Sequence, residues 1–120
     1  MSAHKPLEGV KVVELASFVA APTAGRMMAE MGADVIRVES TAGDPWRFYG
    51  ANCGLPITDD ENPLFDIYNL GKKDIQLNTK TPEGKEILFH LLDEADVFIT
   101  NNRLKSLVRA GLDYDSLTHQ

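Results

Sequence analysis

Residues 10–15 read VKVVEL, and residues 33–39 read ADVIRVE. Both runs are short and rich in β-branched residues, which predicts buried strands at 10–15 and at 35–39. Between them, Pro22 or Thr23 opens a helix that runs to Met31, and Gly32 stands where a left-handed C-terminal cap belongs. A strand, a short helix and a strand in succession form a βαβ unit, whose strands are parallel and whose crossover is right-handed.

The chain after this unit predicts a continued alternation of strands and helices. Residues 41–70 are rich in glycine and proline, which indicates a long irregular segment, with a short helix near 63–69. The elements expected after it are a strand at 73–78, a helix capped by Thr81 and running to about Glu94, a strand at 97–99, a short helix at 103–110 and the start of another at 114–118. The predicted fold class is α/β, with a Rossmann-like parallel sheet.

Helical spacing also predicts which side chains face the core. The inward positions expected on three helices are Met27, Met28 and Met31, then Ile87, Leu88, Leu91, Leu92 and Ala95, then Leu104, Leu107 and Val108. Parallel sheets are covered by helices on both faces, and two sizeable helices are few for four strands. We therefore expect residues 1–120 to be the N-terminal portion of a larger domain.

The composition is that of an ordinary globular domain. Hydrophobic residues make up 43% of the 120 residues and charged residues 25%, which argues against disorder, collagen and coiled coil. The net charge of −6 argues against general nucleic-acid binding, and no apolar run is long enough to span a membrane. Cys53 is the only cysteine, so no internal disulfide is expected, and the predicted location is the cytoplasm.

Ligands of an open parallel sheet bind beyond the carboxyl ends of its strands. The first such loop, residues 16–25, has neither the three-glycine fingerprint of dinucleotide sites nor the GxxxxGK[ST] pattern of phosphate loops. Glu39 stands where a ribose-binding acid would, but without those glycines it does not predict a nicotinamide-dependent dehydrogenase. The small residues of the loop either admit a ligand close to the backbone or pack the helix on the strand.

Polar and basic side chains gather where the third and fourth predicted strands end. They are Asn78, Lys80, Asn101, Asn102 and Arg103, with Arg109 on the following helix. Asparagine suits a purine edge or a ribose, and lysine and arginine suit phosphates. The cluster is therefore a candidate nucleotide site, although a solvated surface charge is the better interpretation of any single lysine.

The other residues that could carry chemistry are isolated. The three histidines have no metal-ligand spacing with one another or with Cys53, so no metal site is predicted. Three aromatic residues of the irregular segment form either a lid over an apolar substrate or a small core of that segment: Trp46, Phe48 and Tyr49.

Seven segments in order carry a family resemblance: PLEGVKVVEL (6–15), AAP (20–22), MGADVIRVE (31–39), GDP (43–45), KKDIQLN (72–78), KTPEGK (80–85) and ADV (95–97). They resemble the class III CoA-transferases, the family of formyl-CoA transferase, the carnitine CoA-transferases and α-methylacyl-CoA racemase. Three further segments, at 14–22, 41–47 and 111–114, are most similar to the clostridial 2-hydroxyacyl CoA-transferases, which act on phenyllactate or 2-hydroxyisocaproate in amino-acid fermentation.

This resemblance implies transfer of CoA from an acyl-CoA, such as an enoyl-CoA, to a 2-hydroxy acid. It implies a homodimer of interlinked chains, with residues 1–120 as the N-terminal portion of the CoA-binding domain and no permanently bound cofactor. A family aspartate attacks the thioester and forms a mixed anhydride and then an aspartyl-CoA thioester. That aspartate lies beyond Gln120 in family members and no acid of this chain matches it, so we expect the segment alone to be inactive.

The resemblance also implies which residues contact CoA. They are Val19, Ala20, Leu77, Asn78, Lys80, Asn101, Asn102, Arg103 and Arg109. Phe18, Val19 and Trp46 are the candidate lining of an acyl pocket. Some relatives have a glutamine where this chain has Val19, and a basic residue where it has Ser40. An apolar Val19 beside Phe18 suits an alkyl or aryl acyl group.

Two other functions stay open on the sequence. One is an epimerase of the α-methylacyl-CoA racemase type, which keeps the fold and changes the reaction. The other is a non-catalytic nucleotide-binding or interaction module.

Overall fold

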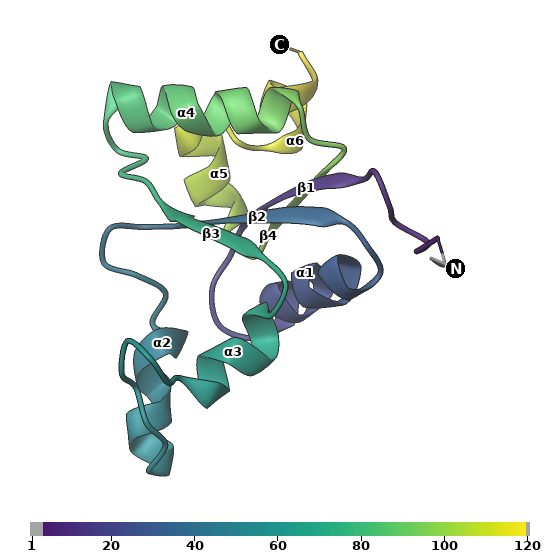
Figure 1. Ribbon diagram of the computed structural model, residues 1–120. Helices are drawn as coiled ribbons and strands as arrows, with labels where there is room; N and C mark the ends of the chain where they lie inside the picture. The colour runs from purple at the N-terminus through teal and green to yellow at the C-terminus, as the bar shows by residue number, and fades with distance from the viewer. Residues whose placement is uncertain (1–3, 120) are drawn as a thin grey trace.

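Four short parallel strands form a sheet in the computed structural model, which describes residues 4–119 (Figure 1). The strands are β1 (Lys11–Leu15), β2 (Asp34–Glu39), β3 (Lys73–Gln76) and β4 (Val97–Thr100). They lie in the order β3-β2-β1-β4, so the order reverses at β1, which has β2 on one side and β4 on the other. Val13 of β1 lies opposite Ile36 and Phe98. The predicted Rossmann-like parallel sheet is confirmed.

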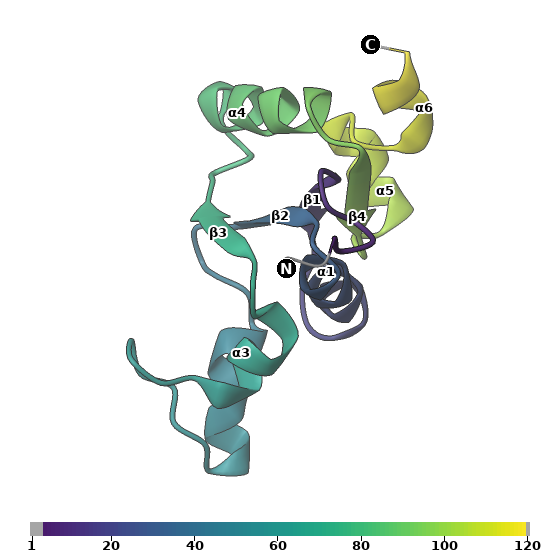
Figure 2. The ribbon, with the colours of Figure 1, turned by 45° about the vertical axis from the view of Figure 1, so that its right-hand side comes forward.

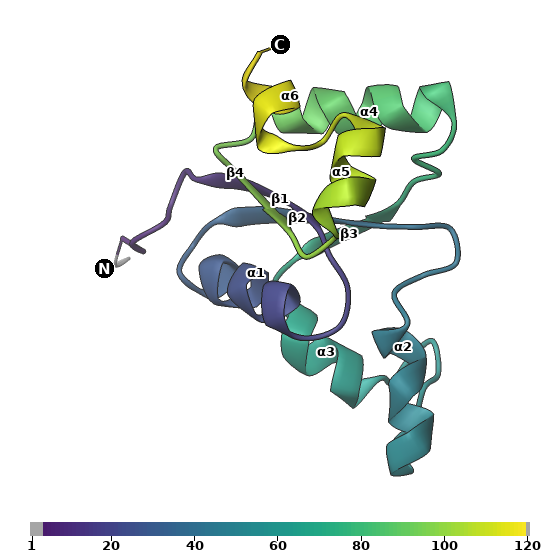
Figure 3. The same cartoon turned by 180° about the vertical axis from the view of Figure 1, so that it is seen from behind.

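Helices cover both faces of this sheet (Figures 1 and 3). One face carries α1 (Ala20–Glu30) and α3 (Pro63–Asn69), and the other carries α4 (Pro82–Asp93), α5 (Leu104–Ala110) and α6 (Tyr114–Thr118). Between β2 and α3, the chain forms α2 (Trp46–Tyr49) and the 3₁₀-helix η1 (Gly50–Cys53), which project away from the sheet in Figure 2. The irregular segment predicted at 41–70 thus contains these turns besides the predicted helix at 63–69.

The apolar side chains divide between the two faces because successive residues of a strand point in opposite directions. Val13 and Val38 pack with Leu88 of α4 and Leu112, on the face that carries α4 and α5. On the opposite face, the neighbouring residues Val12 and Val35 pack with Met28 and Ala29 of α1. The central strands β1 and β2 are therefore buried on both sides, as parallel strands usually are, whereas β3 at the edge is largely exposed.

Local signals set the helix ends. Thr81 caps α4, because its Oγ1 accepts a hydrogen bond from Gly84 N at 3.1 Å, and Pro82 fills the first position, as predicted. Gly32 and Gly111 follow α1 and α5 with φ of 104° and 72°, the left-handed conformation expected of a glycine after a helix. Helix α1 begins at Ala20, before the predicted start at Pro22 or Thr23, because Val19 O already accepts Thr23 N at 2.8 Å.

Several predicted inward positions are wrong. Met27 and Met31 are exposed, whereas Met28 of the same helix reaches the core. Leu104 and Val108 are 69% and 56% exposed. The reason is that α5 rests on the core through Leu107 and Ala110, which turns the neighbouring stripe of the helix outward. Likewise Ile87 is exposed, because α4 buries Leu88 instead.

Within residues 4–119, no helix combines the length and the apolar composition that a membrane span needs.

Candidate functional site

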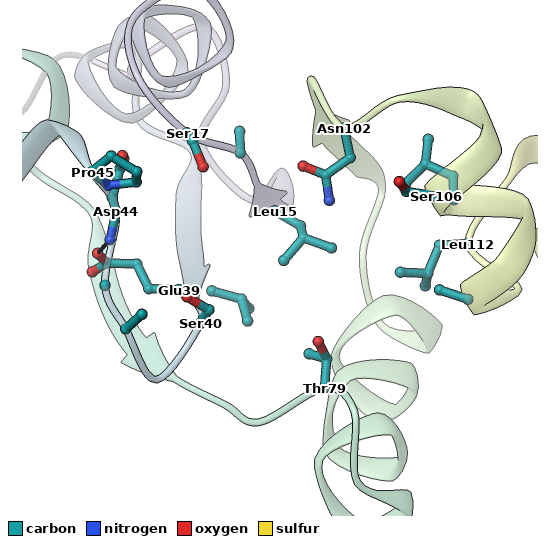
Figure 4. Close-up of a pocket in the computed structure, with 16 residues that line it drawn as sticks. Leu15, Ser17, Glu39, Ser40, Asp44, Pro45, Thr79, Asn102, Ser106 and Leu112 are labelled. Carbon is teal, nitrogen blue, oxygen red and sulfur yellow. Dashed lines mark hydrogen bonds between the residues drawn. The ribbon is translucent and has the colours of Figure 1, made fainter.

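A cavity of about 400 Å³ opens at the carboxyl edge of the sheet, between the loops that leave all four strands (Figure 4). The volume falls within the ~300–1,000 Å³ typical of small-molecule sites. It lies where the strand order reverses at β1, the position at which open α/β sheets bind ligands. The labelled lining residues come from the end of β1 and the loop after it (Leu15, Ser17), from the end of β2 and the loop after it (Glu39, Ser40, Asp44, Pro45), from the loop after β3 (Thr79), and from the chain beyond β4 (Asn102, Ser106, Leu112).

Apart from two carboxylates, the lining consists of apolar side chains and of neutral groups that can form hydrogen bonds. Apolar surface comes from Leu15, Val38, Ala42, Leu107, Ala110 and Leu112, and hydroxyl and amide groups come from Ser17, Ser40, Thr79, Asn102 and Ser106. None of the lining side chains that the structure describes is a lysine or an arginine. This chemistry suits an uncharged ring or sugar rather than a phosphate.

Two carboxylates on one wall of the cavity are already engaged. Asp44 is 3% exposed, and its two oxygens accept hydrogen bonds from the guanidinium of Arg37 and from backbone amides. Glu39 accepts bonds from Arg47 at 2.8 and 2.6 Å and from Asp44 N at 2.7 Å. Burial opposes ionisation of Glu39, but these bonds outweigh it and lower its pKa to about 2. Neither acid is free to act as a base.

Beneath this wall lies a buried ion network that was not predicted from the sequence. Glu14 of β1 and Arg37 of β2 are direct partners in the sheet register, both fully buried, with 2.7 Å between Oε2 and Nη1. Lys72 Nζ lies 2.7 Å from the other oxygen of Glu14, and Asn69 Oδ1 accepts from Arg37 at 3.0 Å. The sequence did contain a signal for this network, because Glu14 and Arg37 are charged residues inside two apolar strands, and a buried charge needs a partner.

Burial shifts the titration of this network. It raises the pKa of Glu14 and lowers the pKa of Lys72, although each group opposes the shift of the other. At the edge of the network, burial and the nearby carboxylate of Glu39 raise the pKa of Asp74 to about 7. The charge count acts in the same direction as burial, since these ion pairs join one more acid than base: Glu14, Glu39, Asp44 and Asp74 against Arg37, Arg47 and Lys72.

A second, open hollow adjoins the cavity and brings several predicted residues together. Its lining residues are Ser17, Phe18, Asn101, Asn102, Arg103 and Ser106, of which Ser17, Asn102 and Ser106 also line the cavity. The side-chain amide of Asn101 is bound by the protein itself. It accepts from Ser17 N at 3.1 Å and donates to Ser17 O at 2.7 Å, and so ties the loop after β1 to the loop after β4.

The other predicted contacts lie on the same edge without lining either hollow. Val19 and Ala20 are the N-cap and first residue of α1. Leu77 continues the pairing of β3 with β2 through a bond from its amide to Glu39 O, and its side chain packs into the core. Asn78 accepts from Lys80 N at 3.2 Å in a tight turn. Exposed residues at this edge are Asn78 and Lys80, beside the lining residue Thr79, and Arg109, beside the lining residue Ala110.

Trp46 belongs to a small aromatic cluster. Its ring stacks on Tyr49 at 4.7 Å between centroids and meets Tyr68 and Phe18 edge-on at 5.7 and 6.2 Å. Trp46 and Tyr49 thus pack together, but Phe48 is 57% exposed and takes no part in these ring contacts, and Phe18 is 47% exposed. No cluster of histidine, cysteine, aspartate and glutamate within residues 4–119 has the arrangement of a metal site.

Comparison with known proteins places this geometry in a family. The chain is 52% identical over 109 residues to cinnamoyl-CoA:phenyllactate CoA-transferase of Clostridium sporogenes, a match that covers 91% of this chain and 26% of that protein. It is 49% identical over 111 residues to (R)-2-hydroxy-4-methylpentanoate CoA-transferase of Clostridioides difficile, covering 92% and 28%. The chain thus spans just over a quarter of the length of these relatives.

The likeness extends to solved structures. A CAIB/BAIF family protein from Brucella suis superposes with a TM-score of 0.88 at 41% identity, over 98% of this chain and 31% of that one. The model of the family described as CoA-transferase family III matches residues 7–120, which is nearly the whole chain. The chain therefore belongs to CoA-transferase family III.

Proposed function

We propose that this chain supplies the CoA-binding part of an enzyme that transfers CoA from an enoyl-CoA to a 2-hydroxy acid. The observation that carries the proposal is the cavity at the strand-order reversal. Its walls are apolar and neutral polar apart from two carboxylates that the protein itself engages, and no lysine or arginine is among its described lining residues. Its walls suit the adenine and ribose of CoA. Lys80, Arg103 and Arg109 are exposed and adjoin lining residues in the chain, and in this proposal they meet the phosphates.

The substrate class rests on the relatives. The names of the two clostridial relatives specify transfer to phenyllactate and to a branched 2-hydroxy acid. Both acids carry an apolar group on a 2-hydroxy acid skeleton, which fits the exposed ring of Phe18 and the apolar Val19 beside the open hollow.

The reaction we propose follows the covalent route of the resemblance. An aspartate outside this chain attacks the thioester carbonyl, which gives a mixed anhydride and frees CoA as a thiolate. The thiolate then attacks the aspartyl carbonyl of the anhydride, which gives an aspartyl-CoA thioester and releases the donor acid. The same steps in reverse pass CoA to the acceptor acid. In this scheme residues 1–120 hold CoA, a second chain completes an interlinked homodimer, and the location is cytoplasmic.

Titration calorimetry of the complete polypeptide tests the binding proposal. We expect CoA and 3′-phospho-ADP to bind, since both carry the adenosine end, and pantetheine to bind far more weakly. Asn102→Ala and Arg109→Ala should each weaken CoA binding by about 1–3 kcal/mol. Lys73→Ala is the matched control, because Lys73 is a surface cation at the amino end of β3 that pairs with Asp34 at 3.0 Å.

The outcomes separate the possibilities. Absence of CoA binding would refute the proposal, and an Arg109→Ala affinity equal to that of Lys73→Ala would remove the phosphate assignment. A racemase-type enzyme would bind CoA but exchange the α-proton of an acyl-CoA without moving CoA to a free acid. CoA binding without either activity would indicate a binding module.

A further inference from the structure

Phe18, in the loop between β1 and α1, has a backbone conformation that a side chain disfavours. Its φ is +66°, and among the described residues 4–119 no other non-glycine residue has a positive φ. The left-handed region brings Cβ close to the following carbonyl oxygen, so single residues stay there only where their surroundings hold them. Phe18 is 47% exposed and its ring has one edge-on aromatic contact, with Trp46 at 6.2 Å, so side-chain packing alone does not account for the conformation.

The main chain of Phe18 is held by Asp44. Oδ1 of Asp44 accepts from Phe18 N at 3.2 Å and from Trp46 N at 2.9 Å. The other oxygen is bound by the guanidinium of Arg37, and the amide of Asp44 donates to Glu39 at 2.7 Å. The carboxylate is almost fully buried and is fixed through both oxygens, so it cannot turn away from Phe18.

The preceding residue is held from the opposite side of the cavity. Asn101, after β4, makes two hydrogen bonds to the backbone of Ser17, as described above. The segment Ser17-Phe18 is thus fastened to the loop after β4 by one residue and to the loop after β2 by the next. Ser17 and Asp44 both line the cavity, where Figure 4 shows them on the same side. The conformation of this segment therefore shapes the cavity wall.

We propose that Asp44 is a positioning residue of the candidate CoA site, which holds the backbone of Phe18 in the left-handed conformation and so fixes the first loop along the cavity. Asp44 acts through the amide of Phe18 and not on the substrate. Without that acceptor, Phe18 would return to the right-handed or extended region, and the chain between Ser17 and the start of α1 would take another path. The ligand-binding part of this inference rests on the proposed function.

The test combines Asp44→Ala with two changes at position 18. Phe18→Ala removes the ring but keeps Cβ, so the left-handed conformation stays unfavourable. Phe18→Gly removes Cβ as well, so the conformation no longer needs to be held. We expect Asp44→Ala to weaken CoA binding about tenfold more in the Phe18 and Phe18→Ala proteins than in the Phe18→Gly protein. Asp44→Ala also removes the carboxylate that binds Arg37, but this effect on affinity is the same in all three proteins and cancels in the comparison.

An equal loss of affinity in all three proteins would overturn the proposal, because Asp44 would then act only as the ion partner of Arg37. A second comparison needs no Asp44 variant and therefore does not depend on its folding. With Asp44 intact, Phe18→Gly should unfold at a higher urea concentration than Phe18→Ala, and the reverse order would also overturn the proposal. If the unaltered protein does not bind CoA, the proposed function fails. The effect of Asp44→Ala on urea unfolding, compared between the Phe18, Phe18→Ala and Phe18→Gly proteins, then still decides the role of Asp44.

Discussion

Replacing Gly25 by alanine is the sharpest stability test that the structure offers. Gly25 is a buried residue of α1, the helix that crosses the sheet over Glu14. A Cβ at this position would overlap Oε1 of Glu14 and lie 3.1 Å from its Cδ and 3.2 Å from Cε of Lys72. Glu14 cannot move aside cheaply, because Arg37 and Lys72 hold its two oxygens at 2.7 Å and its side chain is fully buried.

The expected magnitude follows from two opposing effects. Alanine in place of glycine within a helix stabilises by about 1 kcal/mol. Breaking a buried ion pair costs about 3–5 kcal/mol, and lifting α1 off the sheet instead would expose apolar surface at Met28 and Val35. We therefore expect Gly25→Ala to lower the free energy of unfolding by about 2–4 kcal/mol.

Urea unfolding followed by circular dichroism measures this loss. Ala24→Gly is a control for helix propensity at an exposed position of the same helix, and it should cost only about 1 kcal/mol. In a Glu14→Ala background the obstructing oxygen is absent, so Gly25→Ala should become neutral or stabilising. If Gly25→Ala were neutral beside the native Glu14, the close approach of α1 to the ion pair would be refuted.

Three further predictions concern the loops and the network. Thr81→Ala should lower the free energy of unfolding by about 1 kcal/mol through loss of the α4 cap, and Thr81→Ser should restore most of it. Asn101→Ala should cost about 1–2 kcal/mol, since it removes two hydrogen bonds to Ser17; no loss of stability in urea would contradict this. Asp74 has a raised folded-state pKa of about 7, so the folded protein keeps a proton there that the unfolded chain releases near pH 4. Stability in urea should therefore fall as pH rises from about 4 to 7, and Asp74→Asn should flatten that slope; an unchanged slope would show that Asp74 is not its source.

The predicted elements and the observed ones agree where the signals are local. Each of these signals acts over a few residues and can therefore be recognised in the sequence. They are the apolar runs at 10–15 and 35–39, the helix start at Thr81-Pro82 and the glycine after α1. Predictions of burial failed where they depended on how a helix is rotated against the sheet. Leu104 and Val108 have the spacing of an inward stripe, yet α5 meets the core through Leu107.

The candidate site shows the same division. Strand ends that carry Asn101, Asn102 and Arg103 could be assigned to one edge, because parallel strands place their carboxyl ends together. That the side-chain amide of Asn101 binds the backbone of Ser17 could not be predicted, since it depends on a partner 84 residues away. All nine predicted CoA contacts stay predictions that the binding experiments test: Val19, Ala20, Leu77, Asn78, Lys80, Asn101, Asn102, Arg103 and Arg109.

Apolar runs, caps and a βαβ spacing were enough to predict an α/β sheet, its parallel strands and the edge where we propose that a ligand binds, because each is set by neighbours in the chain. The strand order, the pairing of Glu14 with Arg37 and the hold of Asp44 on Phe18 emerge only in three dimensions. A charge within a buried strand requires a partner, but the identity of that partner depends on register and on which helix crosses above it. Strand register and helix placement are set by packing between segments that are distant in the chain, so they cannot be predicted from the residues next to the charge.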